Sequence, residues 1–242
     1  QIIPPSIALV LLGDIMSSAY QQAQLRMNII NTDTVSVGDL FIGAMMPGIT
    51  LVMMYLAYVL LRAAWQPDTA PPAKMEKTDS TAAIKAVLPP LGLIVLVLGS
   101  ILVGAATPTE AAGVGATGAL LLALARGTLT FSVLQDISRS TLYTSSMVFL
   151  ILIGAAIFSL VFRGFGGDAL IEAFFEGLGG GPHMALLVVM LAMFLLGFIL
   201  DFIEITFVVV PVVGPVLLSM GFDPIWLGVM IAVNLQTSFL TP

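Results

Sequence analysis

The feature that most constrains this chain is a series of apolar runs that are each about as long as a membrane is thick. A helix needs ~20 predominantly apolar residues to cross the hydrocarbon core of a bilayer. Leu40–Leu61, Ala86–Ala106 and Leu142–Phe162 meet this length, and the Gly/Ala-rich run Pro108–Ala125 is slightly shorter. Charged residues make up 9% of the 242 positions, against roughly 25% in a typical soluble domain. The sequence therefore predicts an all-α polytopic membrane protein.

The composition also excludes several classes of function. The chain has no cysteine and a single histidine, His183, which excludes disulfides, cysteine-ligated metals and a histidine-rich metal site. Its net charge of -6 comes without the basic cluster that nucleic-acid binding requires. No signal peptide opens the chain, which runs from Gln1 to Pro242, so we expect an internal part of a longer protein. We expect neither a cofactor nor a nucleic-acid partner.

The polar connections differ in their basic residues, and this difference predicts the orientation in the membrane. Arg62–Lys85 holds four basic residues and Arg126–Arg139 holds two, whereas Gln21–Asp39 and Arg163–His183 hold one each. The positive-inside rule places the first pair of connections in the cytoplasm and the second pair outside. Ser132–Ser140 is expected to form a short surface helix before the next span.

The apolar stretch Met184–Ser219 is too long for one span. Its roughly 36 residues would form a helix of ~54 Å, which exceeds the ~30 Å hydrocarbon core even with strong tilt. Asp201 and Glu204 interrupt the stretch near its middle, and Gly197 also favours a break. We therefore expect a helical hairpin that enters and leaves the membrane on the same side, in preference to one long tilted helix.

Two prolines near the start of the chain predict a broken helix within the membrane. Pro4 and Pro5 lack backbone N–H groups and end any helix that arrives from before them, so that a half-helix begins near Ser6. The free N–H groups and positive dipole end of such a half-helix suit a carboxylate, and the carbonyls of the preceding half suit Na⁺. Pro4, Pro5 and Ser6 are therefore candidate substrate-binding residues. A proline kink without a ligand is the alternative.

A similar break closes the chain. An apolar half-helix after Asp223 leads into Thr237, Ser238 and Thr241, followed by Pro242. Paired broken helices in corresponding positions indicate a transporter site, so the three hydroxyl residues are further candidates for substrate binding. The half-helix after Pro5 should run outward and the one after Asp223 inward, which favours an inverted repeat.

The acids of the long apolar stretch are the third candidate. Ionisable residues between apolar helices are costly and usually functional. At a hairpin tip, Asp201 and Glu204 could coordinate a cation, or they could simply cap freed backbone N–H groups. Asn234 and Thr237 complete the predicted ion-binding set, although Asn234 could instead form an interhelical hydrogen bond.

Several motifs along the chain, taken in order, resemble the large membrane subunit of TRAP (tripartite ATP-independent periplasmic) transporters. They are Ile3-Pro4-Pro5-Ser6-Ile7, Val37-Gly38-Asp39-Leu40-Phe41-Ile42-Gly43-Ala44 with Pro47-Gly48, Ala106-Thr107-Pro108-Thr109-Glu110-Ala111-Ala112, Leu196-Gly197-Phe198-Ile199-Leu200-Asp201, Pro211 with Pro215, Gly221-Phe222-Asp223-Pro224 and Leu240-Thr241-Pro242. The resemblance covers nearly the whole chain, and the ordered set is more specific than any one of its pieces.

The resemblance implies an elevator-type transporter fold with inverted repeats, discontinuous helices and a re-entrant hairpin. It implies Na⁺-coupled uptake of an organic acid anion, such as a dicarboxylate, across a bacterial or archaeal inner membrane. A periplasmic solute-binding protein would deliver the anion, and a small membrane subunit would complete the complex. The first hairpin and the opening scaffold helices would then precede Gln1.

Carried over to this sequence, the family's organisation divides the chain into seven parts. These are the end of the first repeat (1–39), a spanning helix (40–61), a cytoplasmic linker (62–85), three spanning helices of the second repeat (86–162), an outer loop (163–183), the hairpin (184–219) and a last half-helix with its break (223–242).

Three alternatives remain at this point. Another ion-coupled elevator-type anion symporter would share the broken helices, and a non-transporting structural subunit could contain them as mere kinks. An intramembrane aspartyl protease would need two carboxylates on facing spans that share a proton. Asp201 has only Glu204 near it in sequence, on the same turn, which disfavours the protease.

Overall fold

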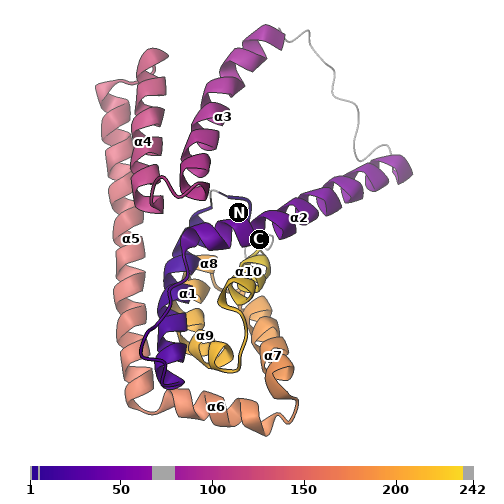
Figure 1. The fold of residues 1–242 in the computed structure, drawn as a ribbon. Helices are drawn as coiled ribbons and strands as arrows, with labels where there is room; N and C mark the ends of the chain where they lie inside the picture. The colour runs from indigo at the N-terminus through magenta and orange to yellow at the C-terminus, as the bar shows by residue number, and fades with distance from the viewer. Residues whose placement is uncertain (1, 5, 67–79, 237–242) are drawn as a thin grey trace.

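The computed structural model describes residues 2–4, 6–66 and 80–236, and the regular secondary structure of these residues is entirely helical (Figure 1). The elements are α1 (Ile7–Arg26), α2 (Val37–Trp65), α3 (Ser80–Leu102), α4 (Pro108–Ala125), α5 (Phe131–Gly164), α6 (Gly167–Gly177), α7 (Gly181–Leu196), α8 (Phe202–Glu204), the π-helical turn η2 (Ile205–Val209), α9 (Val210–Ser219) and α10 (Pro224–Leu235). Within the described ranges, five helical stretches are long and apolar enough to cross a membrane. The predicted all-α polytopic class is confirmed.

Local sequence signals set the helix boundaries. Helix α4 has the predicted bounds because Thr107 and Glu110 form a reciprocal capping box: the Thr107 hydroxyl accepts from the Glu110 N–H at 3.3 Å, and the Glu110 carboxylate accepts from the Thr107 N–H at 2.8 Å. Ser36 and Asp39 form a second capping box, so α2 begins at Val37 and continues to Trp65, past the expected Leu61. The predicted cap at Thr107 located the start of α4, whereas apolar content alone placed the start of α2 at Leu40 and missed the cap at Ser36.

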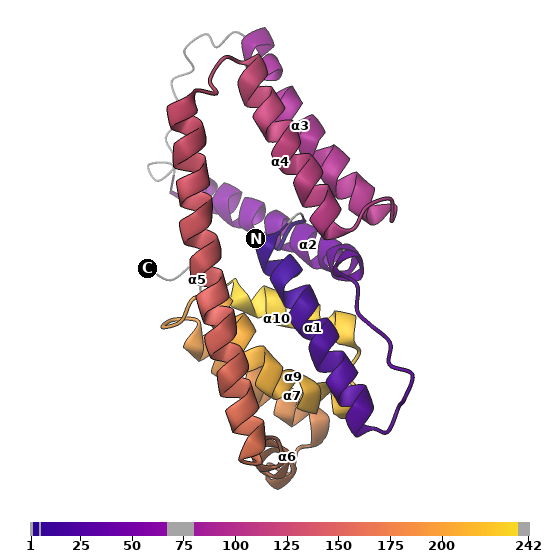
Figure 2. The same ribbon diagram turned by 90° about the vertical axis from the view of Figure 1, so that its left-hand side faces the viewer.

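The protein core lies where α1, the start of α2, α7, α9 and α10 pack together (Figures 1 and 2). Helix α1 buries Leu9, Leu12 and Met16, which recur at the spacing of one helix face. Leu217 of α9 and Ile231 of α10 are also fully buried. Among the described residues, the most extensive contact between two helices is that between α1 and α9.

Two glycines allow the core helices to approach closely. A Cβ atom at Gly228 of α10 would lie 2.7 Å from Leu40 Cδ2 of α2, and one at Gly13 of α1 would lie 2.7 Å from Val37 Cγ2. Both distances are well below van der Waals contact. Small residues that let helix backbones approach are typical of membrane helix packing.

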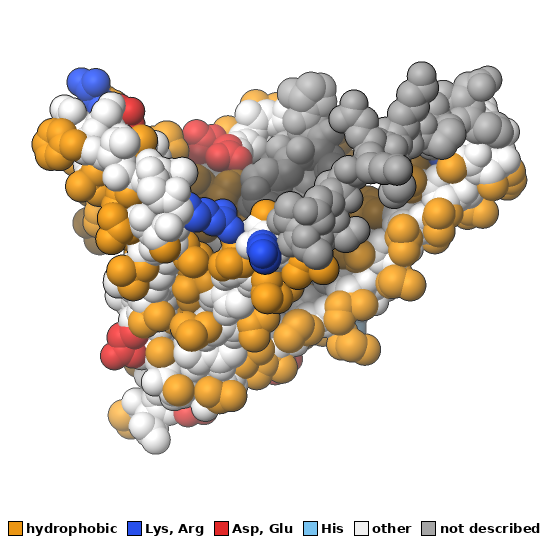
Figure 3. All heavy atoms as spheres, turned by 90° about the horizontal axis from the view of Figure 1, so that it is seen from above, with side chains coloured by type: hydrophobic (Ala, Val, Ile, Leu, Met, Phe, Trp, Pro, Cys, Tyr) orange, Lys and Arg blue, Asp and Glu red, His pale blue; other side chains and the backbone are white. Residues whose placement is uncertain are grey.

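Helices α3, α4 and α5 lie at the side of this core and expose most of their apolar side chains (Figure 1). Helices α3 and α4 pack on each other, whereas α5 contacts η2 and α6. In the view from above, hydrophobic side chains cover much of the surface (Figure 3). The separate surface helix expected at Ser132–Ser140 was wrong, because these residues form the first turns of the continuous 34-residue helix α5. No proline or glycine occurs between Phe131 and Gly154, so nothing interrupts the backbone hydrogen bonds.

The connection 163–183, which we expected as a loop, contains helix α6. This helix is bent by 114° relative to α7. Its residues Ile171 and Phe175 pack into the core, whereas Asp168, Glu172 and Glu176 recur every fourth residue on another face. The apolar residues of this segment do have helical spacing, but the segment is short and flanked by glycines, which favoured the prediction of a loop.

The stretch 184–219 is broken where the acids predicted a break. Helix α7 ends at Leu196, non-helical backbone follows, and α8 starts after Asp201. Helices α7 and α9 lie side by side in Figure 1, they contact each other, and α6 contacts both of them. The stretch therefore forms two antiparallel arms, and its re-entrance into a membrane stays a prediction.

The second arm contains a feature that the sequence reading missed, the π-helical turn η2. Pro211 has no N–H to donate, and its ring would clash with the Phe207 carbonyl in a regular α-helix. The N–H of Val210 bonds to the Ile205 carbonyl, five residues earlier, and so widens the turn. The fully buried hydroxyl of Thr206 donates to the Phe202 carbonyl at 2.7 Å. Such π turns are frequent at functional sites.

Candidate ion and substrate site

The first predicted break is present as non-helical backbone before α1. Ser6 is the N-cap residue with extended backbone (φ -127°, ψ 130°), and its buried hydroxyl accepts from the Leu9 N–H at 3.4 Å. Ile2 and Pro4 are buried, and Ile2 and Ile3 lie against Gly48 of α2. The first turn of α1 contains no acidic residue. The positive end of α1 therefore faces the break, and no carboxylate in the first turn of the helix neutralises it. Pro5 lies outside the described residues.

The second predicted break begins at the end of α10. Helix α10 finishes at Leu235 with Gln236 as its C-cap. Asn234 donates from Nδ2 to the Met190 carbonyl of α7 at 2.7 Å, which is the interhelical bond that the sequence left open. This bond fixes the end of α10 against the first arm of the hairpin. Thr237, Ser238, Thr241 and Pro242 lie outside the described residues.

The two acids differ in their surroundings. Asp201 is exposed and caps α8, because one of its carboxylate oxygens accepts from the Phe202 N–H at 2.8 Å. Glu204 is half-buried in the single turn of α8. Among the residues that the structure describes, no group of three or more acidic, histidine or cysteine side chains could hold a metal ion. A cation here would therefore need backbone carbonyl and hydroxyl oxygens as well as these carboxylates.

The tertiary structure brings the predicted elements to one end of the core. Figures 1 and 2 place the start of α1, the turn 197–201 and the end of α10 at the same level. Ala8 and Leu9 of α1, Phe202 of α8 and Leu235 of α10 belong to one buried cluster. Helix α1 runs away from this level, whereas α10 lies across the molecule in Figure 2. The inverted repeat stays a prediction. Backbone N–H groups of one helix and carbonyl groups of another thus face the same region.

An ion pair outside this region went unnoticed in the sequence. Arg26 at the end of α1 pairs with Asp168 and, at 2.9 Å, with Glu172 of α6. Arg26 is more than 140 residues away from both acids in sequence, so only the tertiary structure reveals the pairing. The pair fixes the connecting helix α6 to the core.

Residues 1–242 match the family described as "Tripartite ATP-independent periplasmic transporter, DctM component". The chain belongs to this TRAP transporter family. The resemblance seen in the sequence is thereby confirmed, as is the inner-membrane location. Membership disfavours the protease and the unrelated elevator symporter, since the family is one of transporter permease components.

Curated relatives are similar over most or all of this chain. The ectoine/5-hydroxyectoine TRAP transporter large permease protein UehC of Ruegeria pomeroyi is 27% identical over 242 residues, covering 100% of this chain and 52% of UehC. The sialic acid large permease SiaM of Vibrio cholerae is 26% identical over 244 residues, again 100% of this chain and 52% of the relative. The C4-dicarboxylate large permease DctM of Pseudomonas aeruginosa is 31% identical over 214 residues, 86% of this chain and 48% of that protein. The chain spans about half the length of the curated relatives it matches.

Proposed function

We propose that the full-length protein takes up an organic acid anion together with Na⁺, as the large membrane subunit of a three-part transporter. The observation that carries this proposal is the meeting of the α1 start, the α10 end and the 197–201 turn at one end of the core. Family membership and relatives named for sialic acid and C4-dicarboxylates support the substrate class.

The substrate carboxylate would bind at the start of α1. Ser6 caps the Leu9 N–H, and the earlier N–H groups of the helix and its positive dipole end favour an anion there. Ser6, Pro4 and Pro5 would shape this side, and Thr237, Ser238 and Thr241 would bind the anion from the second break. The first turn of α1 has no acidic side chain, so no carboxylate of the helix itself would compete with the substrate for these N–H groups.

Na⁺ would bind beside the carboxylate, at the negative end of α10 and the hairpin tip. Unwound carbonyls and helix C-termini coordinate Na⁺ in transporters of this kind. Asp201, Glu204, Asn234 and Thr237 would contribute to this site, with Asn234 acting through its carbonyl oxygen because its nitrogen bonds Met190. No cofactor is needed, because the Na⁺ gradient supplies the energy.

Transport by an elevator mechanism would divide the molecule in two. The core of α1, α7, α9 and α10 would move with the bound ions and anion, and the lipid-facing helices α3–α5 would belong to the fixed scaffold. A periplasmic solute-binding protein would deliver the anion, and a small membrane subunit would complete the scaffold.

The test uses the full-length protein with its small subunit in lipid vesicles. The binding protein encoded beside them is first screened by thermal shift against C4-dicarboxylates and sialic acid, and the ligand found is then radiolabelled. We expect uptake only with an inward Na⁺ gradient and with the binding protein present. Uptake that is equally fast in K⁺ buffer would contradict Na⁺ coupling, and full uptake without the binding protein would contradict the three-part assembly.

A further inference from the structure

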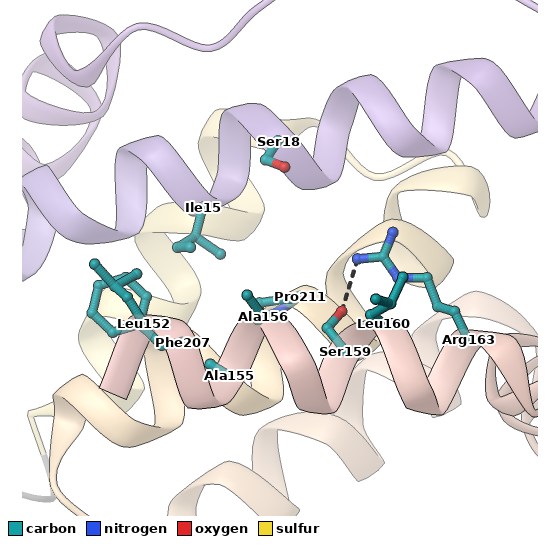
Figure 4. Close-up of a pocket in the computed structure, with 10 residues that line it drawn as sticks. All are labelled: Ile15, Ser18, Leu152, Ala155, Ala156, Ser159, Leu160, Arg163, Phe207 and Pro211. Carbon is teal, nitrogen blue, oxygen red and sulfur yellow. Dashed lines mark hydrogen bonds between the residues drawn. The ribbon is translucent and has the colours of Figure 1, made fainter. Parts of the chain in front are cut away.

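A groove between α1 and α5 lies outside the predicted transport site. It has a volume of about 340 Å³, within the ~300–1,000 Å³ range of ligand sites. Helices α1 and α5 form its walls, and Phe207 of η2 and Pro211 of α9 form its floor (Figure 4). The π turn is thus part of this groove.

The groove is apolar at one end and polar at the other. Figure 4 shows Leu152 and Phe207 at one end, and Ser18, Ser159 and Arg163 toward the other. Such a division matches a molecule with a hydrocarbon chain and a polar head.

The charge at the polar end has no counterpart in the described part of the chain. The Arg163 guanidinium donates to the Ser159 hydroxyl at 2.8 Å, four residues earlier on the same helix. No carboxylate of the described residues lies within ion-pair distance of it, whereas Arg26 has two acidic partners. An anion placed at the mouth of the groove would therefore pair with Arg163 and could also accept from Ser18.

The position of Arg163 along α5 matches the depth of lipid phosphates. The apolar segment Leu142–Phe162 is ~31 Å long at 1.5 Å per residue, which equals the ~30 Å hydrocarbon core. Arg163 follows this segment directly, so a bilayer matched to the segment would have the Arg163 guanidinium at the lipid–water boundary. Arg139 lies just beyond the opposite end of the segment but does not line the groove.

We propose that this groove binds one anionic phospholipid of the leaflet in which Arg163 lies. Arg163 and Ser18 bind the phosphate, and one acyl chain lies along Leu152, Ala156 and Phe207. The site is independent of the transport site, because it uses a different pair of helix faces. Basic pockets between membrane helices are a known mode of anionic lipid recognition.

The experiment measures lipid retention by native mass spectrometry on the full-length protein with its small subunit. Dioleoyl phosphatidylglycerol is titrated into the detergent-purified complex, with dioleoyl phosphatidylcholine as the neutral lipid. We expect one tightly bound phosphatidylglycerol and at least about tenfold weaker phosphatidylcholine binding, because charge-assisted hydrogen bonds are the stronger kind. Arg163→Gln should weaken phosphatidylglycerol binding about tenfold, and the matched variant Arg139→Gln should not.

A second pair of variants tests the acyl chain. Ala156→Phe fills the groove and should also weaken binding about tenfold, whereas Ile157→Phe introduces the same side chain at a position that does not line the groove and should leave binding unchanged. Wild-type affinity in Arg163→Gln or Ala156→Phe would overturn the proposal. Equal competition by inorganic phosphate would show a headgroup-only site and would also overturn it.

A photo-crosslinker at position 156 separates a lipid from a protein occupant. We expect a lipid adduct by mass. An adduct to the small subunit, or to another part of the full-length chain, would show that protein fills the groove and would overturn the lipid assignment.

Discussion

The core helices differ from α3, α4 and α5 in how regular their backbone is. Helices α3, α4 and α5 are continuous helices of 18 to 34 residues that expose most of their side chains. Only α3 has prolines in its interior, Pro89 and Pro90, and the Ala86 carbonyl accepts from the Arg126 side chain instead of the missing Pro90 N–H.

The core contains the break before α1, the turn 197–201 and the π turn η2. Buried side chains surround η2 and Ser6, whereas Phe198, Ile199 and Asp201 of the turn are exposed in the described part of the chain.

This difference indicates which part of the protein can hold a binding site made of backbone groups. Irregular backbone is tolerated at membrane depth only where protein or a wet cavity surrounds it. The breaks therefore require the packed core, and the regular helices do not. Variants placed in pairs, one in each region, test this division.

The largest expected effect comes from adding bulk to a core glycine. Gly228→Leu places a side chain where a Cβ already lies 2.7 Å from Leu40 Cδ2, and such overpacking costs about 1–3 kcal/mol. The matched variant Gly154→Leu on α5 meets open space and should be neutral or slightly stabilising. Thermal unfolding in detergent measures both, and equal losses would contradict the division.

The next effect concerns transport. Asp201→Asn keeps a side chain that can cap α8, since Asn is as good an N-cap as Asp, but removes the charge. We expect at least about a tenfold loss of apparent Na⁺ affinity in vesicle uptake, roughly 1.4 kcal/mol. Asp223→Asn is the control, because the Asp223 carboxylate also caps a helix, accepting from the Trp226 N–H at the start of α10, and is not part of the predicted ion site. Unchanged Na⁺ dependence in Asp201→Asn would show that Asp201 only caps α8 and does not bind Na⁺.

A smaller effect is expected where α6 joins the core. Arg26→Gln leaves Asp168 and Glu172 without their cation in a half-buried position, and should cost about 1 kcal/mol. The exposed Arg126 bonds only the Ala86 carbonyl among the described residues, so Arg126→Gln should cost a few tenths of a kcal/mol, about what an exposed pair contributes. Denaturant unfolding in detergent compares the two, and the reverse order would show that α6 is not fixed by this pair.

The smallest effect compares two helix caps. Ser6→Ala removes a buried cap and leaves the Leu9 N–H without its partner, whereas Thr130→Ala removes an exposed cap that water can replace. Loss of a cap costs about 1 kcal/mol, and we expect the buried cap to cost about 0.5 kcal/mol more. Hydrogen exchange at the first turns of α1 and α5 measures the difference. Equal exchange would indicate that water reaches the break before α1.

Particular residues show how far sequence reasoning reached. Thr107 and Glu110 located the start of α4, and Asp201 located the break in the long apolar stretch, because caps and charges act locally. The π turn at Pro211 was missed although proline is the local cause, since the sequence does not reveal whether a helix kinks, widens or ends there. Helix α6 and the pair of Arg26 with Asp168 were missed because they depend on contacts between distant segments.

The sequence by itself determined the membrane class, the starts of α4 and α10, the break in the long apolar stretch and the family. These follow from apolar length, caps and prolines, which are properties of neighbouring residues. Only the tertiary structure decided that the start of α1, the turn 197–201 and the end of α10 meet at one level, and that a groove lies beside Arg163. Packing between distant helices sets these relations, through close approaches such as that of Gly228 to Leu40, and no local pattern encodes them.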